Sequence, residues 1–257
     1  MLENFGYFEY VIRGLAAVGS AVIKNGVGVG AGIFMLPLLS LALPAKVALG
    51  LGAPVMVVSD VAGVIYYWGE WDKRELIRLL PPAVLGIVLG TTMIKVIPNE
   101  WFRFWVALFA ILFASYQLFK LGRSKRITSS GWTSGQSSIR RVFPVFFGFL
   151  AGVASSVIHA GGLVMSPYLI QKLTDKRGFV GTFVLFFAIM NFLKLIAYLH
   201  IHILTCQSLL LAAIISPLII VGGFCGNLLN KHVSQKAFRA IVLTVILIIG
   251  IDLLIEM

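Results

Sequence analysis

Two glycine-rich interruptions of an otherwise apolar chain contain residue types that could bind an anion. The first runs from Gly28 to Pro37 and the second from Ala160 to Pro167. A break of this kind exposes the first N–H groups of the helix that follows it, and the positive end of that helix dipole attracts an anion. Doubled hydrophobic segments with such breaks are also typical of the binding sites of transporters built from repeats. We therefore expect substrate contacts from Gly28, Gly30, Gly32, Pro37, Gly161, Gly162 and Pro167.

Close helix packing is the alternative role of these glycines, because small residues are favoured where membrane helices touch. A side chain placed at Gly32 or Gly162 separates the two roles, since loss of flux favours binding and loss of folding favours packing. Packing is the expected role of two further small-xxx-small pairs, Gly86 with Gly90 and Gly222 with Gly226.

A few polar or ionisable side chains interrupt the apolar segments, where each is costly enough to suggest a function. Asp60 lies in the middle of an uncharged segment, Asn191 lies at the matching place in the second half of the chain, and Lys194 follows one helical turn later. We expect Asn191 and Lys194 to contact the substrate, and Asp60 or His159 to carry a coupling proton. The structural alternative is that Asp60 pairs with Lys194 or a backbone donor and that His159 is a satisfied polar residue.

The composition is that of an all-α integral membrane protein. Hydrophobic residues make up 59% of the 257 residues and charged residues 12%, which is too little polar surface to cover a soluble domain. The net charge of +11 comes from Lys and Arg in short loops beside apolar segments, as the positive-inside rule requires. The expected partner of these charges is anionic lipid at the cytoplasmic face, not nucleic acid. No cofactor or metal is expected, because Cys206 and Cys225 lie singly in apolar runs that favour a buried apolar role.

An internal repeat divides the chain into two halves. At one constant offset, Pro81, Gly86, Gly90, Lys95, Phe102 and Arg103 recur as Pro217, Gly222, Gly226, Lys231, Phe238 and Arg239. We predict repeat 1 over 1–121, a basic cytoplasmic linker over 122–141 and repeat 2 over 142–257. Each repeat is expected to contain five membrane segments, the first two of them short, which gives about 8–10 membrane helices. The predicted segments are 8–23, 27–43, 47–68, 76–97, 101–121, 143–158, 161–173, 179–199, 203–229 and 236–255.

The charges of the loops indicate that the two repeats are inverted, with the Gly- and Pro-broken helices at their interface. The basic loop around Lys73 matches the turn from His200 to Leu204, which contains no Lys or Arg, so matching loops are expected on opposite sides of the membrane. An odd number of passes in each repeat produces this arrangement, which many secondary transporters share. It predicts an N-terminus outside the cell and a linker in the cytoplasm.

The doubled breaks and the basic central linker resemble the TauE/SafE family of membrane permeases, also called the sulfite exporter or toluene sulfonate uptake permease family. The resemblance covers nearly the whole chain, although the fuller Gly-Gly-Gly cluster of the family is replaced here by Gly30-Ala31-Gly32 and Ala160-Gly161-Gly162. It implies a multi-pass protein of the cell (inner) membrane. It also implies alternating-access transport of small sulfur-containing or organic anions such as sulfite, sulfonate or thiosulfate. The resemblance is compatible with transport that is coupled to protons.

The sequence favours a carrier over several other classes of function. The chain has no HExxH, no GxSxG with acid and histidine partners, and no Gly-x4-Gly-Lys-Ser/Thr loop for ATP, so we expect neither an enzyme nor a nucleotide-driven pump. A passive anion channel and a non-transporting membrane subunit are the alternatives, and saturable flux that responds to a counter-gradient distinguishes a carrier from a channel. A membrane-embedded lipid phosphatase is less favoured, because it matches this chain in architecture only.

Overall fold

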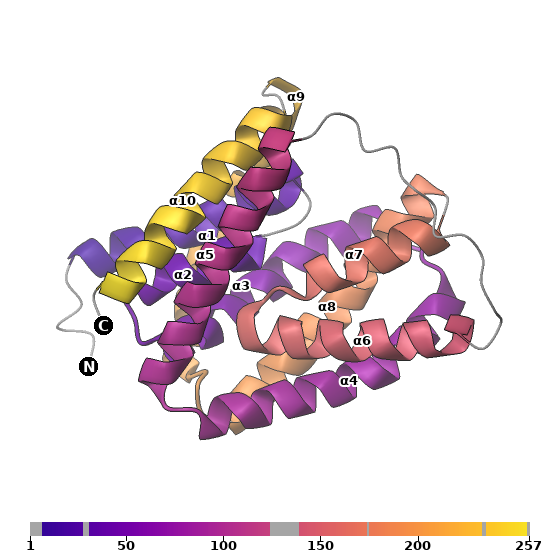
Figure 1. Cartoon of the computed structure of the whole chain (residues 1–257), viewed down its shortest axis with the longest axis horizontal. Helices are drawn as coiled ribbons and strands as arrows, with labels where there is room; N and C mark the ends of the chain where they lie inside the picture. The colour runs from indigo at the N-terminus through magenta and orange to yellow at the C-terminus, as the bar shows by residue number, and fades with distance from the viewer. Residues whose placement is uncertain (1–6, 28–30, 124–138, 174, 233–234, 256–257) are drawn as a thin grey trace.

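The structure, a computed structural model, describes residues 7–27, 31–123, 139–173, 175–232 and 235–255. These residues form ten α-helices and no strand, which confirms the all-α prediction (Figure 1). The helices are α1 (Tyr7–Val27), α2 (Ala31–Ser40), α3 (Ala45–Tyr66), α4 (Lys73–Val96), α5 (Asn99–Arg123), α6 (Ile139–Ile158), α7 (Gly161–Lys172), α8 (Lys176–His200), α9 (Cys206–His232) and α10 (Gln235–Ile255). Part of the first break, 28–30, and most of the predicted linker, 124–138, lie outside the described residues.

The lengths of the helices decide which of them can cross a bilayer. Among the described residues, α3, α4, α5 and α8 are long and apolar enough to do so. The helices α2 and α7 contain 10 and 12 residues, which corresponds to lengths of about 15 and 18 Å against a hydrocarbon core of about 30 Å. The second segment of each half is therefore short, as predicted. The first segments are longer than predicted, because α1 contains 21 residues and α6 contains 20.

Each short helix packs back against the helix that precedes it, α2 on α1 and α7 on α6. At the second of these turns, a Cβ on Gly161 would lie 2.7 Å from the carbonyl oxygen of Ala151, so only glycine allows this approach of α7 to α6. The prolines of the two breaks lie inside the short helices, Pro37 in α2 and Pro167 in α7. Both helices continue past their proline, so neither proline ends its helix.

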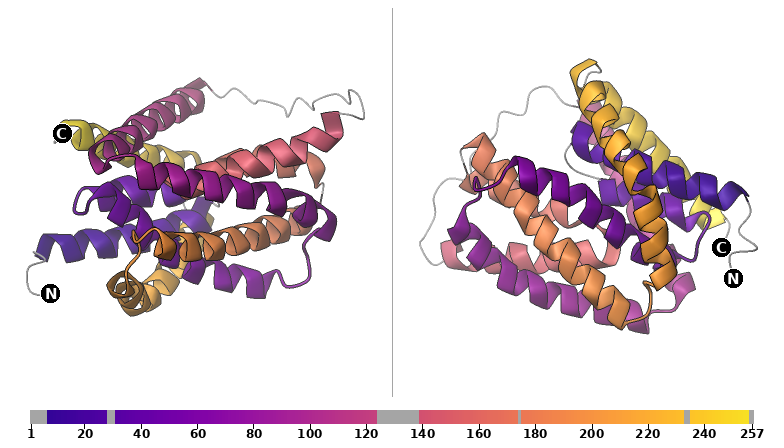
Figure 2. Two further views of the ribbon diagram at one scale, coloured as in Figure 1. Left: turned by 90° about the horizontal axis from the view of Figure 1, so that it is seen from below. Right: turned by 180° about the vertical axis from the view of Figure 1, so that it is seen from behind.

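The two halves of the chain are interlocked, because α4 packs along α6 and α9 packs along α1 (Figure 2). Glycines bring both pairs of helices close together. A Cβ on Gly86 would lie 3.0 Å from the Cα of Gly152, and one on Gly222 would lie 2.8 Å from the carbonyl oxygen of Val18. Since Gly86 and Gly222 match in the repeat, the same position makes the same kind of contact in each half. The packing role predicted for these two glycines is confirmed.

The third helices of the two halves, α3 and α8, pack against each other in opposite directions. The start of α3 contacts the turn that follows α8, and the end of α3 contacts the first half of α8. In order along α3, the pairs are Gly50 with Ile203, Asp60 with Asn191 and Gly63 with Val184. The helices α5 and α10, also matching members of the two halves, pack side by side as well (Figure 1).

The two largest of four apolar clusters in the described residues each combine helices from both halves. One draws mainly on α1, α2, α3 and α9, and the other on α4, α6, α7 and α8. Many large apolar side chains point outward instead, among them Ile65, Val96 and Ile214. An apolar exterior around a helical core suits a lipid environment.

Candidate functional site

The two glycine-rich breaks come together in the structure. Gly32, in the first turn of α2, is buried, and a Cβ at this position would lie 2.5 Å from the carbonyl oxygen of His159 at the second break. The other glycines predicted in the first break, Gly28 and Gly30, lie outside the described residues. Because the contact at Gly32 is a close approach of two backbones, it favours the packing alternative for this glycine.

The second break presents the start of α7. His159 lies between α6 and α7 with a φ of 53°, a left-handed conformation that lets the chain turn sharply. The N–H groups of Gly161 and Gly162 belong to the first turn of α7, where no partner within the helix is available to them. Gly161 is buried against α6 and Phe187, whereas Gly162 is partly exposed. Anion binding at this helix start stays a prediction.

Lys194 is the most deeply placed cation of the site, with only 1% of its surface exposed. Its Nζ donates to the carbonyl oxygen of Ser155 at 3.1 Å and lies 3.0 Å from Nδ1 of His159. Ser155 belongs to the last turn of α6, where its carbonyl oxygen also accepts a hydrogen bond from the N–H of His159 at 3.2 Å and where the helix dipole is negative. The ammonium group of Lys194 therefore stabilises the end of α6 at the break from which α7 begins.

A second side chain of α8 supports the same helix end. The hydroxyl group of Tyr198, one turn after Lys194, donates to the carbonyl oxygen of Ser156, and the Tyr198 side chain is fully buried. Reasoning from the sequence missed Ser155, Ser156 and Tyr198 as members of the site. The available signal for Tyr198 is its position four residues after Lys194, on the same helix face.

The matching residues Asp60 and Asn191 are in direct contact. The side-chain amide of Asn191 donates to Oδ2 of Asp60 at 2.5 Å, and the two side chains are 4% and 3% exposed. Asn191 lies one turn before Lys194 on α8. The structure thus brings four predicted site residues together along α8, Asp60 from α3, His159 from the break, and Asn191 and Lys194 from α8 itself.

The remaining predicted residues are less closely associated with this group. Pro37 is buried and Pro167 is exposed. Free N–H groups are found in the first turn of a helix, and both prolines lie beyond that turn in α2 and α7. In the described part of the chain, no group of three or more His, Cys, Asp or Glu side chains could hold a metal ion. Cys206 and Cys225 are free and exposed, so the prediction that they are buried is wrong. An apolar run does not distinguish a core position from one facing lipid.

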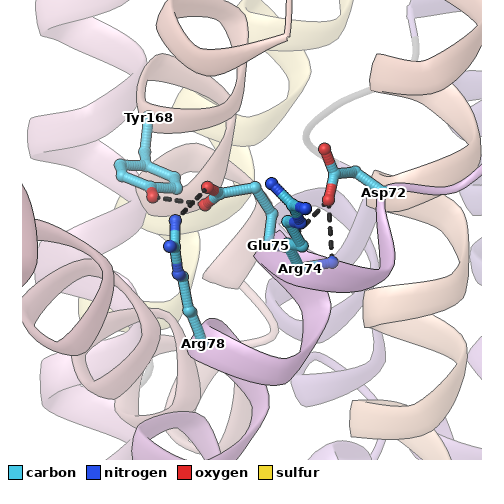
Figure 3. Close-up of polar contacts among 5 residues, drawn as sticks. All are labelled: Asp72, Arg74, Glu75, Arg78 and Tyr168. Atoms are coloured by element: carbon cyan, nitrogen blue, oxygen red, sulfur yellow. Dashed lines mark hydrogen bonds and ion pairs between the residues drawn. The ribbon is translucent and has the colours of Figure 1, made fainter.

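A second polar cluster lies at the start of α4 (Figure 3). Asp72 caps this helix by accepting hydrogen bonds from the N–H groups of Arg74 at 2.8 Å and Glu75 at 3.0 Å. The buried carboxylate of Glu75 accepts one hydrogen bond from the hydroxyl group of Tyr168 at 2.6 Å and another from Arg78 at 3.1 Å. Since Tyr168 belongs to α7, these bonds join the short helix of the second half to α4 of the first half.

The same loop is joined to α8 by two further contacts, Asp72 N–H with Thr182 Oγ1 at 2.8 Å and Glu70 with Arg177 at 2.7 Å. The matching contact in the other half has a different chemistry. In the repeat, Leu38 matches Tyr168 and Leu51 matches Thr182, and both leucines pack in an apolar cluster that contains Leu204. Polar and ionic contacts therefore join the loop before α4 to the second half, and apolar contacts take their place at the matching position.

Comparison with known proteins identifies the family of this chain. The model of a family described as sulfite exporter TauE/SafE matches residues 14–253, which is nearly the whole chain. A search of curated proteins and a search of solved structures found no match. The family match agrees with the apolar helices of the fold, since its members are membrane transporters. The chain is thus an integral membrane protein that belongs to the sulfite exporter TauE/SafE family.

Proposed function

We propose that this protein is a secondary transporter for small sulfur-containing or organic anions such as sulfite, sulfonate or thiosulfate. The observation that carries the proposal is the position of Lys194, whose charge is buried at the break from which α7 begins. A full positive charge inside a membrane protein is costly and suggests an anionic ligand. The first N–H groups of α7 add donors of the same polarity, with Gly162 as the more accessible of the two glycines.

The transport cycle is proposed to use two inverted repeats. The matching helices of the two halves, α3 and α8, pack antiparallel to each other. A rotation that superimposes one half on the other therefore also reverses the direction of this helix. If α3 and α8 both cross the bilayer, the two halves of the chain have inverted topologies. The swapped charges of the matching loops support the same arrangement. Alternating access would then be a rocking of the interlocked helices around the breaks, with the N-terminus outside and the linker inside the cell.

Asp60 is the better candidate for the coupling proton. An ionised carboxylate only accepts hydrogen bonds, and Asn191 donates to Asp60 in this structure. A protonated carboxyl group needs an acceptor instead, and the amide of Asn191 can supply one by turning its oxygen toward Asp60. Asn191 therefore suits both protonation states of its neighbour, which a carrier of protons requires.

The proposal is tested by anion uptake into proteoliposomes. Lys194→Gln is expected to weaken the saturable uptake of sulfite or thiosulfate by about tenfold or more, the effect of losing one hydrogen bond to a charged group. Lys95→Gln is the matched control, because Lys95 is exposed at the end of α4. Uptake that does not saturate would instead indicate a channel, and unchanged uptake by Lys194→Gln would rule out the proposed site.

A further inference from the structure

His159 is enclosed by parts of both halves of the chain. Its backbone has a φ of 53° and lies against Gly32 of α2. Its imidazole ring lies over Gly52 of α3, where a Cβ would be only 2.7 Å from Nε2. Two glycines of the first half therefore leave the space that this histidine of the second half occupies. Such close contact on two sides fixes where the ring points.

The two ring nitrogens of His159 have partners of opposite character. Nε2 lies 3.1 Å from the carbonyl oxygen of Leu49, which can only accept a hydrogen bond, so Nε2 must carry a proton. Nδ1 lies 3.0 Å from the ammonium group of Lys194, which can only donate, so Nδ1 must be unprotonated. The contacts together assign a neutral imidazole in the Nε2–H tautomer.

We infer that His159 is a positioning residue for the anion site, and that it does not carry the coupling proton. Its Nδ1 holds the ammonium group of Lys194, and its Nε2–H anchors the ring to α3. A proton added at Nδ1 would face that ammonium group directly. The groups around the ring are the cation of Lys194 on α8, the carbonyl of Leu49 on α3 and the ring of Tyr198, whose centroid lies 6.4 Å away. This inference rests on the proposed function of Lys194 as the anion ligand.

Two amide substitutions separate the two contacts of His159. In His159→Asn the side-chain oxygen falls near the position of Nδ1, so an acceptor for Lys194 is retained, and asparagine tolerates a positive φ. In His159→Gln the side-chain nitrogen falls near the position of Nε2, so the donor to Leu49 is retained and the acceptor for Lys194 is lost. Glutamine is strained at the positive φ of position 159, and this strain lowers the stability of His159→Gln. Thermal unfolding of both variants measures that loss of stability separately from any loss of binding.

Binding of sulfite to the purified protein is the first measurement. His159→Asn is expected to keep an affinity within about threefold of the unmodified protein, and His159→Gln to lose about tenfold, as Lys194→Gln does. The reverse order would mean that His159 acts only by anchoring the break to α3. Equal affinities of the two variants, whether both are kept or both are lost, would also overturn the inference, since the acceptor at Nδ1 would then make no difference.

The tautomer is the second measurement, and it does not require that any anion binds. The chain has four histidines, and comparison with His159→Asn identifies the ring signals of His159 in a protein with ¹⁵N-labelled histidine. At neutral pH these signals are expected to show a protonated Nε2 and an unprotonated Nδ1. An imidazolium or an Nδ1–H tautomer would contradict the assignment. If the tautomer is as expected but Lys194→Gln binds sulfite normally, the proposed anion site fails while the structural role of His159 stands.

Discussion

Replacement of Gly32 by alanine tests whether the two breaks touch as closely as the structure indicates. The new Cβ would lie 2.5 Å from the carbonyl oxygen of His159, whereas ordinary contacts of this kind begin near 3.4 Å. The two breaks would have to separate by about 0.9 Å, and overpacking in a well-packed interior costs about 1–3 kcal/mol. The atoms nearest to this Cβ are the backbone and Cβ of His159 and not the end of a flexible side chain, so a simple change of rotamer cannot relieve the overlap.

The matched control is Gly14→Ala, because Gly14 lies inside α1 and a Cβ there would have no neighbour within 4 Å. The control is expected to be neutral or to stabilise the protein by up to about 1 kcal/mol, since alanine favours a helix more than glycine does. Thermal unfolding in detergent, followed by tryptophan fluorescence, compares the two variants. A Gly32→Ala protein as stable as the Gly14→Ala protein would refute the close contact. Weaker sulfite binding with normal stability would restore Gly32 to the substrate site.

Three further predictions concern the rest of the molecule. Tyr168→Phe removes a hydrogen bond to a buried carboxylate and is expected to lower the stability of the folded protein by about 1.5–3 kcal/mol. Thermal unfolding measures this loss, and Tyr116→Phe is the control because the side chain of Tyr116 is exposed. A cysteine at position 202 in place of His202 is expected to react with an impermeant reagent from outside the cell and one in place of Ser129 only from the cytoplasm; reaction of both from one side would exclude inverted repeats. Asp60→Asn is expected to flatten the dependence of anion flux on pH between about 5 and 8 while changing affinity less, and an unchanged profile would remove Asp60 from the proton path.

Much of the helical architecture could be predicted from the sequence, because composition and hydrophobic length are local properties. The repeat also predicted that Asp60 and Asn191 occupy matching places, and they proved to be in contact. The position of the second break was predictable from its cluster of glycines, although the left-handed turn itself is made by His159 and not by a glycine. A pattern of glycines does not, however, tell what lies against them. Gly32 and Gly52 face a histidine from the other half of the chain, and only the fold shows this.

The partners of charged residues were harder to predict. Lys194 contacts a backbone carbonyl group at the end of α6. A backbone carbonyl leaves no motif in the sequence, so this contact could not be predicted. Glu75 lies among Lys73, Arg74 and Arg78, and this composition indicates a solvated basic loop. Its carboxylate is nevertheless buried by Tyr168, which lies 93 residues later in the chain. Contacts between segments so far apart depend on the packing of whole helices.

The interlocking of the two halves has a consequence for how the protein is made. The helix α1 is synthesised well before α9, the helix that covers it. Until then α1 must be held by lipid or by chaperones of the membrane, and its close-packing surface around Val18 and Ala21 is without its final neighbour Gly222. Contacts of such long sequence separation slow folding and expose intermediates to misassembly. Synthesis stopped before α9 is therefore expected to leave a chain of α1–α8 that quality-control proteases degrade rapidly.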